Sequence, residues 1–190
     1  VNWYNASITV TSATVDGNAA TILVQGRNGS FNTALIGYYS AGGLASGKTV
    51  TATFSASPTV RTIGGMSFLD VDPTTPVSST TGPTNGTAAA WATASATLAA
   101  GGAMVAQAMK DGFSASSNTP AAGVTECFDV STDDTGNTLC YRIEASSGSY
   151  TVGGTWNNAF TNVNVGAVLA PAAGGGPTNY DGTSALSATD

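Results

Sequence analysis

The segment from Val124 to Glu144 constrains the fold more than any other stretch, because its two halves can be aligned with each other. Residues 124–130 and 138–144 both alternate between apolar and polar side chains, and residues 131–137 between them are typical of a turn. This pattern predicts an antiparallel β-hairpin with one buried face and one solvated face.

The two cysteines of the chain lie in this hairpin. A turn centred near Asp133 and Asp134 places Cys127 directly opposite Cys140. Directly opposed residues at a non-hydrogen-bonded pair are close enough for a disulfide. We therefore predict a bridge between Cys127 and Cys140, which would imply an oxidising location. The alternative is that both side chains stay thiols.

The rest of the chain repeats the same kind of pattern. About ten short alternating segments are separated by turn signals such as Asp16-Gly17 and Asn28-Gly29, and no segment has convincing helical periodicity. Parallel sheets would need helical crossovers, so the pattern predicts an all-β fold, an antiparallel two-sheet β-sandwich of jelly-roll-like architecture. We expect residues 1–170 to form this domain. Residues 171–190, rich in Gly, Pro, Ser and Ala, are expected to form a flexible arm.

Charge is scarce and scattered in this sequence. Charged residues make up 8% of the chain and the net charge is -6. Binding to phosphate backbones or to anionic membranes needs clustered basic residues, so we expect neither nucleic acid nor membrane as a partner. The five basic residues occur singly, as Arg27, Lys48, Arg61, Lys110 and Arg142. No apolar run approaches the roughly 20 residues of a membrane helix.

Few residues offer catalytic chemistry. The chain has no histidine, which removes the Ser-His-Asp triad and every His-ligated metal site. It also lacks phosphate-binding and dinucleotide-binding motifs, and we expect no cofactor. Paired carboxylates would suffice for glycoside cleavage. The hairpin register places Glu126 on the apolar face beside Tyr141, where its pKa would rise unless it lies at a solvated edge. We assign no catalytic residue and predict that the protein is not an enzyme.

Two loops carry oxygen donors that calcium could use. Asp133, Asp134 and Asn137 share one predicted turn, and Asp70 lies two residues before Asp72. The alternative is that Asp and Asn simply occur as favoured turn residues. We assign no metal site and leave Ca²⁺ near Asp133, Asp134 and Asn137 as an open possibility.

Aromatic side chains could form a platform for sugar rings. Adjacent strand residues point to opposite faces, so at least one of Tyr38 and Tyr39 is expected in the core. A sandwich of this size also needs aromatic side chains to fill its interior, which is the alternative role. The other candidates are Trp3, Tyr4, Trp91 and Trp156.

Several short motifs, taken in order, resemble a jelly-roll domain found in virion proteins of tailed bacteriophages and in related bacterial surface proteins. The resemblance covers roughly residues 8–170. Its motifs are Val10 to Thr21, Tyr38-Tyr39, Ala45-Ser-Gly47, Thr49 to Ser55, Arg61, Ala99 to Ala103, Val124-Thr-Glu126 with Phe128 and Asp129, and Gly153-Gly-Thr-Trp156. The opposed cysteines are not part of the family pattern.

The resemblance implies a non-enzymatic structural protein on the exterior of a virion, such as a capsid decoration, a head fibre or a tail appendage. Its expected partners are other capsid or tail proteins, and homo-oligomers, possibly trimers, are expected by symmetry. The chain starts at Val1 rather than Met, so we expect a mature or partial chain.

Two other functions are kept open. A carbohydrate-binding jelly roll would attach a particle or a secreted enzyme to a cell-surface glycan, and exposed Trp rings on one face would favour it. A glycan-cleaving enzyme would need two carboxyl groups about 5–9 Å apart in a cleft.

Overall fold

The structure is a computed structural model that describes residues 1–40, 47–111, 117–132, 135–176 and 178–180. Within these ranges every regular element is a strand, and every strand pair is antiparallel. The predicted all-β antiparallel sandwich is therefore confirmed. The number of strands is larger than the expected ten, because many are only three residues long.

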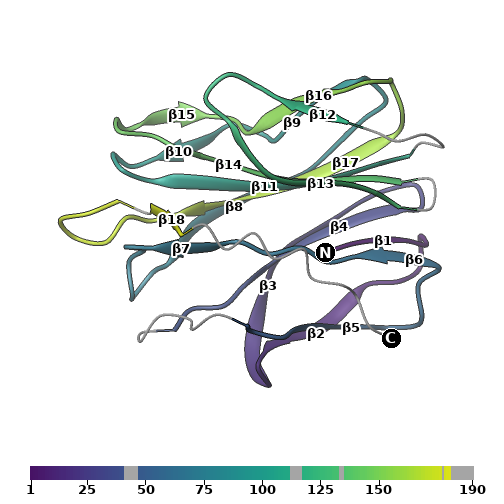
Figure 1. Cartoon of the computed structure of the whole chain (residues 1–190), viewed down its shortest axis with the longest axis horizontal. Coiled ribbons are helices and arrows are strands. Elements are labelled where there is room, and N and C mark those ends of the chain that lie inside the picture. Colours follow the sequence, from purple (N-terminus) through teal and green to yellow (C-terminus); the bar gives the residue numbers. More distant parts are fainter. Residues whose placement is uncertain (41–46, 112–116, 133–134, 177, 181–190) are drawn as a thin grey trace.

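The strands form three stacked layers (Figure 1). The lower layer is a six-stranded sheet with the order β5-β2-β3-β4-β1-β6, and the central sheet has the order β13-β14-β11-β17-β8. A cover layer consists of the sheet β12-β16-β9 and the pair β10-β15. The lower-layer strands are β1 (Asn2–Tyr4), β2 (Val10–Val15), β3 (Asn18–Asn28), β4 (Phe31–Gly37), β5 (Val50–Phe54) and β6 (Val60–Thr62).

The other strands follow in the second part of the chain. Those of the central sheet are β8 (Val77–Gly86), β11 (Ala103–Asp111), β13 (Thr125–Thr132), β14 (Thr135–Ile143) and β17 (Asn162–Leu169). Those of the cover layer are β9 (Ala90–Ala92), β10 (Ala96–Leu98), β12 (Asn118–Pro120), β15 (Gly148–Tyr150) and β16 (Gly153–Trp156). A separate pair at one end joins β7 (Ser67–Leu69) to β18 (Thr178–Tyr180).

The central sheet is covered on both faces, and the side chains of β11 point alternately toward the two covering layers. Met104, Ala106 and Ala108 face the cover layer, while Val105 and Met109 face the lower layer. All residues of β11 except the last are buried. A strand that buries both faces is expected to be apolar almost throughout, and β11 is apolar except for Gln107, Lys110 and Asp111.

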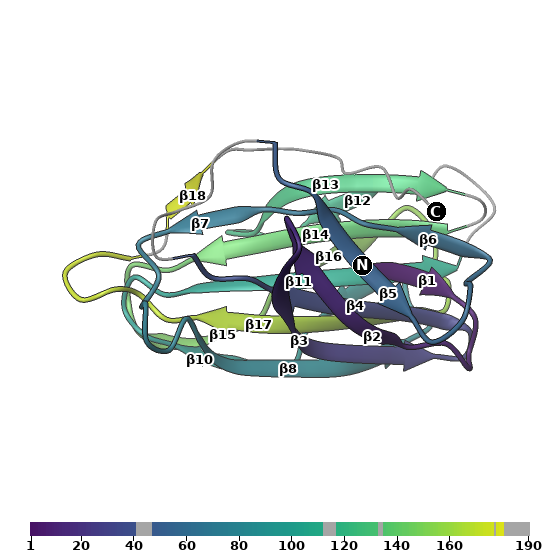
Figure 2. The same ribbon diagram turned by 90° about the horizontal axis from the view of Figure 1, so that it is seen from below.

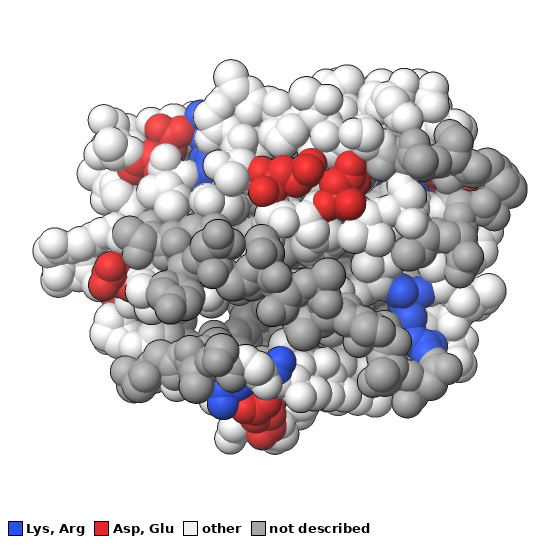
Figure 3. Space-filling model, in the orientation of Figure 1, with Lys and Arg blue, Asp and Glu red and all other residues white. Residues whose placement is uncertain are grey.

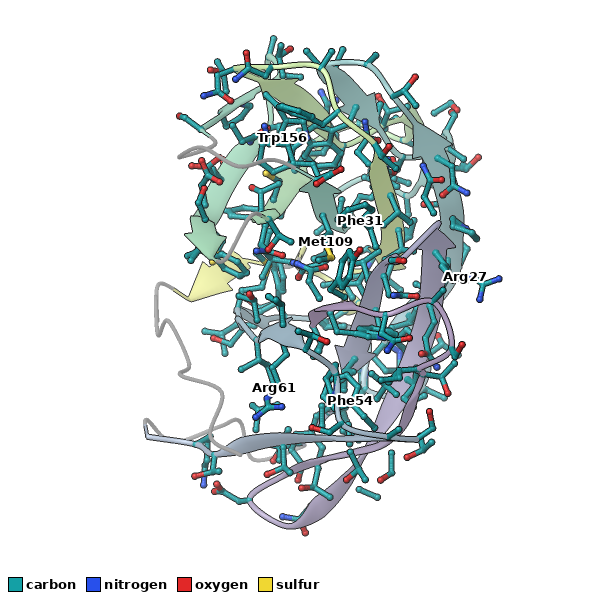
Figure 4. All side chains as sticks on the ribbon, turned by 90° about the vertical axis from the view of Figure 1, so that its right-hand side faces the viewer. Arg27, Phe31, Phe54, Arg61, Met109 and Trp156 are labelled. Atoms are coloured by element: carbon teal, nitrogen blue, oxygen red, sulfur yellow. The ribbon has the colours of Figure 1, made fainter. Side chains whose placement is uncertain are left out.

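The lower sheet curls on itself and encloses a separate core. Trp3 in β1 packs edge-on against Phe54 in β5, with 5.5 Å between ring centroids. Its indole N–H donates to the Ile8 carbonyl at 2.8 Å. Figure 4 labels side chains from the successive interiors: Trp156 under the cover layer, Met109 and Phe31 in the middle, and Phe54 within the lower sheet. In Figure 2, where the lower layer faces the viewer, β2 and β5 run obliquely across the central strands.

The predicted turns are confirmed where backbone geometry demands them. Asp16 and Gly17 both have positive φ values, 48° and 77°, and they join β2 to β3. Gly29, with φ of 62°, joins β3 to β4. These left-handed conformations favour Gly, Asp and Asn, which explains the sequence signal.

The arm does not begin at residue 171, contrary to the prediction. Pro171 forms a bridge with Val71, and the Ala172 N–H donates to the Asp70 carbonyl at 2.8 Å. Strand β18 then pairs with β7. Part of the segment expected as an arm is therefore paired with the body, at Pro171, Ala172 and Thr178–Tyr180, and residues 177 and 181–190 lie outside the described residues.

The hairpin exists, and its predicted register is confirmed from the pair Phe128–Leu139 to the turn but is wrong before Phe128. Glu126 lies opposite Cys140, and Phe128 lies opposite Leu139, with an irregularity between them. Cys127 is therefore the extra residue of a β-bulge. Because of this extra residue, the side chains of the strand residues before Cys127 point to the faces opposite to those predicted.

Candidate functional site

The densest group of ionisable and polar side chains lies between the central sheet and the cover layer. We call it the Lys110 cluster and define it by Lys110, Asn118, Glu126, Asp129 and Asn157. It combines residues of β11, β12 and β13 with the residue that follows β16.

Lys110 enters this cluster because it continues the alternation of β11 toward the cover layer. Its residue is only 1% exposed. The Nζ atom lies 5.3 Å from the ring centroid of Trp156 and 4.8 Å from that of Phe160. It also donates to Oδ1 of Asn157 at 3.4 Å. Two aromatic rings and one amide thus surround the end of a buried lysine.

The bulge at Cys127 explains why two carboxylates join the cluster. Glu126 and Asp129 are three residues apart, so in a regular strand they would point to opposite faces. The extra residue between them brings both to the side of β12. Figure 3 shows acidic side chains side by side over the region of β13 on an otherwise sparsely charged face.

Asn118 links these groups through four hydrogen bonds. Its backbone N–H donates to Oδ2 of Asp129 at 2.7 Å, and its Nδ2 donates to Oε2 of Glu126 at 2.7 Å. A weaker contact joins Nδ2 to Sγ of Cys140 at 3.7 Å. Its Oδ1 accepts from the Trp91 indole N–H at 2.9 Å. A single asparagine therefore fixes β12 to both β13 and β9.

Burial shifts the two charged groups toward their neutral forms. Loss of water contact raises the pKa of Asp129, and the nearby Glu126 raises it further, while the Asn118 N–H and Lys110 oppose the shift. Loss of water contact likewise lowers the pKa of Lys110, against the attraction of Asp129 and Asp111. Among the described residues, Oδ1 of Asp129 is buried and has no hydrogen-bond partner.

The predicted disulfide between Cys127 and Cys140 is not formed, and both side chains are thiols. Cys140 faces the core under the cover layer, whereas Cys127 packs against the core below the central sheet. Because the bulge turns Cys127 away, the two side chains lie on opposite faces of the sheet. Burial raises the pKa of the Cys140 thiol to about 12.

Glu126 is not beside Tyr141 on the apolar face, as the sequence register had placed it. It lies opposite Cys140 and accepts from Asn118. It does come close to a second carboxylate, Asp129, through the shared Asn118. Both carboxylates accept hydrogen bonds from Asn118 and so attach β12 to β13, which is a structural role.

The possible calcium ligands do not come together among the described residues. Asn137 is fully buried and its Nδ2 donates to the Val130 carbonyl and to Oγ1 of Thr135. Asp133 and Asp134 lie outside the described residues. Asp72 accepts from the backbone N–H groups at 74 and 75, as a turn residue does. In the described part of the chain, no group of three or more His, Cys, Asp or Glu residues could hold a metal.

The three tryptophans fill the interior and offer no platform on the surface. Trp3, Trp91 and Trp156 are at most 4% exposed. Tyr39 and Tyr4 are partly exposed, at 41% and 39%, and Tyr4 packs edge-on against Phe31.

Sequence reasoning missed Lys110, Asn118 and Asn157. One signal was present: Lys110 follows Met104, Ala106 and Ala108 at two-residue spacing, on the most apolar strand of the chain. A lysine at such a position is predicted to be buried. Asn118 and Asn157 lie in short cover-layer segments without any periodic pattern.

Comparison with known proteins gives no match: no family model, curated protein or solved structure matches this chain. The described residues include no helix long and apolar enough to cross a membrane. The fold and the Lys110 cluster together define a three-layer antiparallel β-sandwich protein in which a buried lysine contacts an exposed asparagine near two half-buried carboxyl groups.

Proposed function

We propose that this protein is a non-enzymatic structural protein of a phage virion, a surface decoration or fibre domain of jelly-roll type. On the particle exterior it would reinforce the assembly or contact the host surface.

The main support for the proposal is that the aromatic and ionisable side chains mostly make contacts inside the molecule. The three tryptophans, Lys110 and Cys140 are buried. Asp129 accepts from the backbone N–H of Asn118, and Glu126 accepts from its side chain. Such a body holds its shape through internal contacts, as a scaffold requires. The motifs of the resemblance also include strands β2, β5, β13 and β16 of this body.

The surface chemistry supports packing among many copies. Strand β8 forms an edge of the central sheet, and its sequence, VSSTTGPTNG, carries hydroxyl groups and no charge. A neutral, hydroxyl-rich edge meets a neighbour without like-charge repulsion. Partners would be other capsid or tail subunits and further copies of this chain, a trimer being one arrangement.

Proteomics of gradient-purified particles tests this function. We expect this chain to co-sediment with intact virions, to survive a high-salt wash, and to be accessible to antibody on the particle surface. Recovery only in the soluble fraction would contradict the proposal. Binding of the purified protein to glycan arrays, with no association with particles, would instead support a carbohydrate-binding module.

A further inference from the structure

Lys110 and Asn157 approach each other across two layers of the molecule. Lys110 belongs to the central sheet, and Asn157 follows β16 of the cover layer. Their side chains meet at 3.4 Å between Nζ and Oδ1. An amine is thus held against a carboxamide within reach of its Cγ atom.

Asp129 and Asn157 are both hydrogen-bonded to the segment Ser117-Asn118. The Asn118 N–H donates to Oδ2 of Asp129 at 2.7 Å, and the Asn157 N–H donates to the Ser117 carbonyl at 3.1 Å. Asp129 and Asn157 therefore flank one dipeptide. Asp129 also interacts electrostatically with Lys110, and its second oxygen is buried without a partner.

From this geometry we propose that Lys110 and Asn157 form an intramolecular isopeptide bond, with Asp129 as the group that handles the protons. The inference goes beyond the proposed function and does not depend on it.

The reaction balances without a cofactor or an oxidant. The lone pair of the neutral Lys110 Nζ attacks Cγ of Asn157, and a C–N bond forms. Asp129 takes a proton from Nζ and supplies a proton to the amide nitrogen of Asn157. The original C–N bond breaks and ammonia leaves. One amide replaces another, so no atom is oxidised or reduced.

The residues around Lys110 and Asn157 favour the protonation states, the restriction of water and the proximity that this reaction needs. Burial lowers the pKa of Lys110 and raises the pKa of Asp129, which favours a neutral amine and a protonated carboxyl. Trp156 and Phe160 restrict water around Nζ. Among the described residues, the other titratable neighbours are Asp111, on the same strand as Lys110, and Glu126 and Cys140, near Asp129. Holding both reactants in contact replaces a bimolecular encounter by an intramolecular one.

The bond would join the central sheet to the cover layer covalently. It would close a loop from residue 110 to residue 157, which contains β12 to β16. A cross-link of this kind stabilises by restricting the unfolded chain, as a disulfide does. It requires no oxidising compartment.

Mass spectrometry of the denatured full chain tests the proposal. We expect a mass lower than that of the sequence by one ammonia. Succinimide formation at an asparagine also releases ammonia, so the peptide map decides. With only five basic residues, trypsin should release peptide 62–142, uncut at Lys110, joined to peptide 143–190. Separate peptides 62–110, 111–142 and 143–190, with no joined species, would overturn the proposal.

Variants separate the roles of the three residues. Asn157→Ala changes an exposed residue and should fold, yet it should show the full sequence mass and complete cleavage at Lys110. The matched control Asn158→Ala, also exposed, should retain the cross-link. A joined species in Asn157→Ala would overturn the assignment of the acceptor.

Asp129 is tested by its two conservative variants. Asp129→Asn should fold, with an unchanged circular dichroism spectrum, but remain uncross-linked, whereas Asp129→Glu should restore part of the cross-linking. Since both variants keep an oxygen for the Asn118 N–H, a purely structural role would leave cross-linking equal in the two. Cross-linking in Asp129→Asn at the wild-type rate would overturn the role of Asp129.

Discussion

Cys140 shows how burial decides the reactivity of a single residue. Its side chain is fully buried in the apolar core under the cover layer, and the resulting loss of water contact raises its thiol pKa to about 12. The thiolate is the nucleophile, so very little of Cys140 is reactive at neutral pH. Cys127 is half-buried on the other face.

We predict that iodoacetamide at pH 8 labels Cys127 faster than Cys140 in the folded protein. Labelling of Cys140 should rise only toward strongly alkaline pH, and both cysteines should react after unfolding. Peptide mass spectrometry measures the two rates. A mass that increases by two hydrogens on reduction would show instead that the disulfide exists.

A second prediction at this scale concerns Gly153. A Cβ atom there would lie 2.3 Å from the Trp91 carbonyl oxygen and 2.9 Å from Cα of Ala92, on the paired strand. Backbone atoms of a paired strand cannot move aside without breaking the pairing of β16 with β9. Gly153→Ala should therefore lower the free energy of unfolding by about 2–3 kcal/mol, as overpacking does.

Gly175→Ala is the control for this substitution. The nearest atom to its new Cβ, Cβ of Asp70, is 3.7 Å away. We expect a change within about 0.5 kcal/mol in urea unfolding. Equal effects of the two substitutions would contradict the close approach of β9 and β16.

Among the elements, β12 pairs with β16, and one residue links it to β9 and β13. It is three residues long, and Asn118 connects it to Trp91, Glu126 and Asp129. Asn118→Ala would leave the Trp91 N–H and a Glu126 oxygen without their partner. Because buried groups without partners are costly, we expect a loss of about 2–4 kcal/mol in the free energy of unfolding.

Asn158→Ala serves as the control for Asn118, since it removes the same amide from an exposed loop position. It should change the stability by less than about 0.5 kcal/mol. Urea unfolding followed by Trp fluorescence measures both variants. A similar small effect at Asn118 would mean that the network does not hold β12.

The elements also show what the sequence could and could not predict. Turns at Asp16-Gly17 and at Gly29 were predictable, because their backbone conformation selects particular residues. The faces to which the first residues of β13 point were not predictable, because one bulged residue, Cys127, shifts the alternation of the residues before it. Strand β8 was not predictable either, since most of it is exposed and it has no apolar face to form a pattern.

At the scale of the whole molecule, the third layer was the main feature beyond prediction. A two-layer sandwich predicts alternating strands, but β11 buries eight consecutive residues. This run signals a strand covered on both faces. The elements that cover it are short strands from distant parts of the sequence, so their positions depend on tertiary contacts rather than local pattern.

We infer that the three layers form one rigid scaffold around the central sheet. Hydrogen-deuterium exchange with peptide resolution tests it most directly, because β11 is paired on both sides and covered on both faces. We predict the slowest exchange in β11 and β17, with β9 and β16 of the cover layer opening together with them. Fast and independent exchange of the cover layer, or slowest exchange in the lower sheet, would contradict the claim.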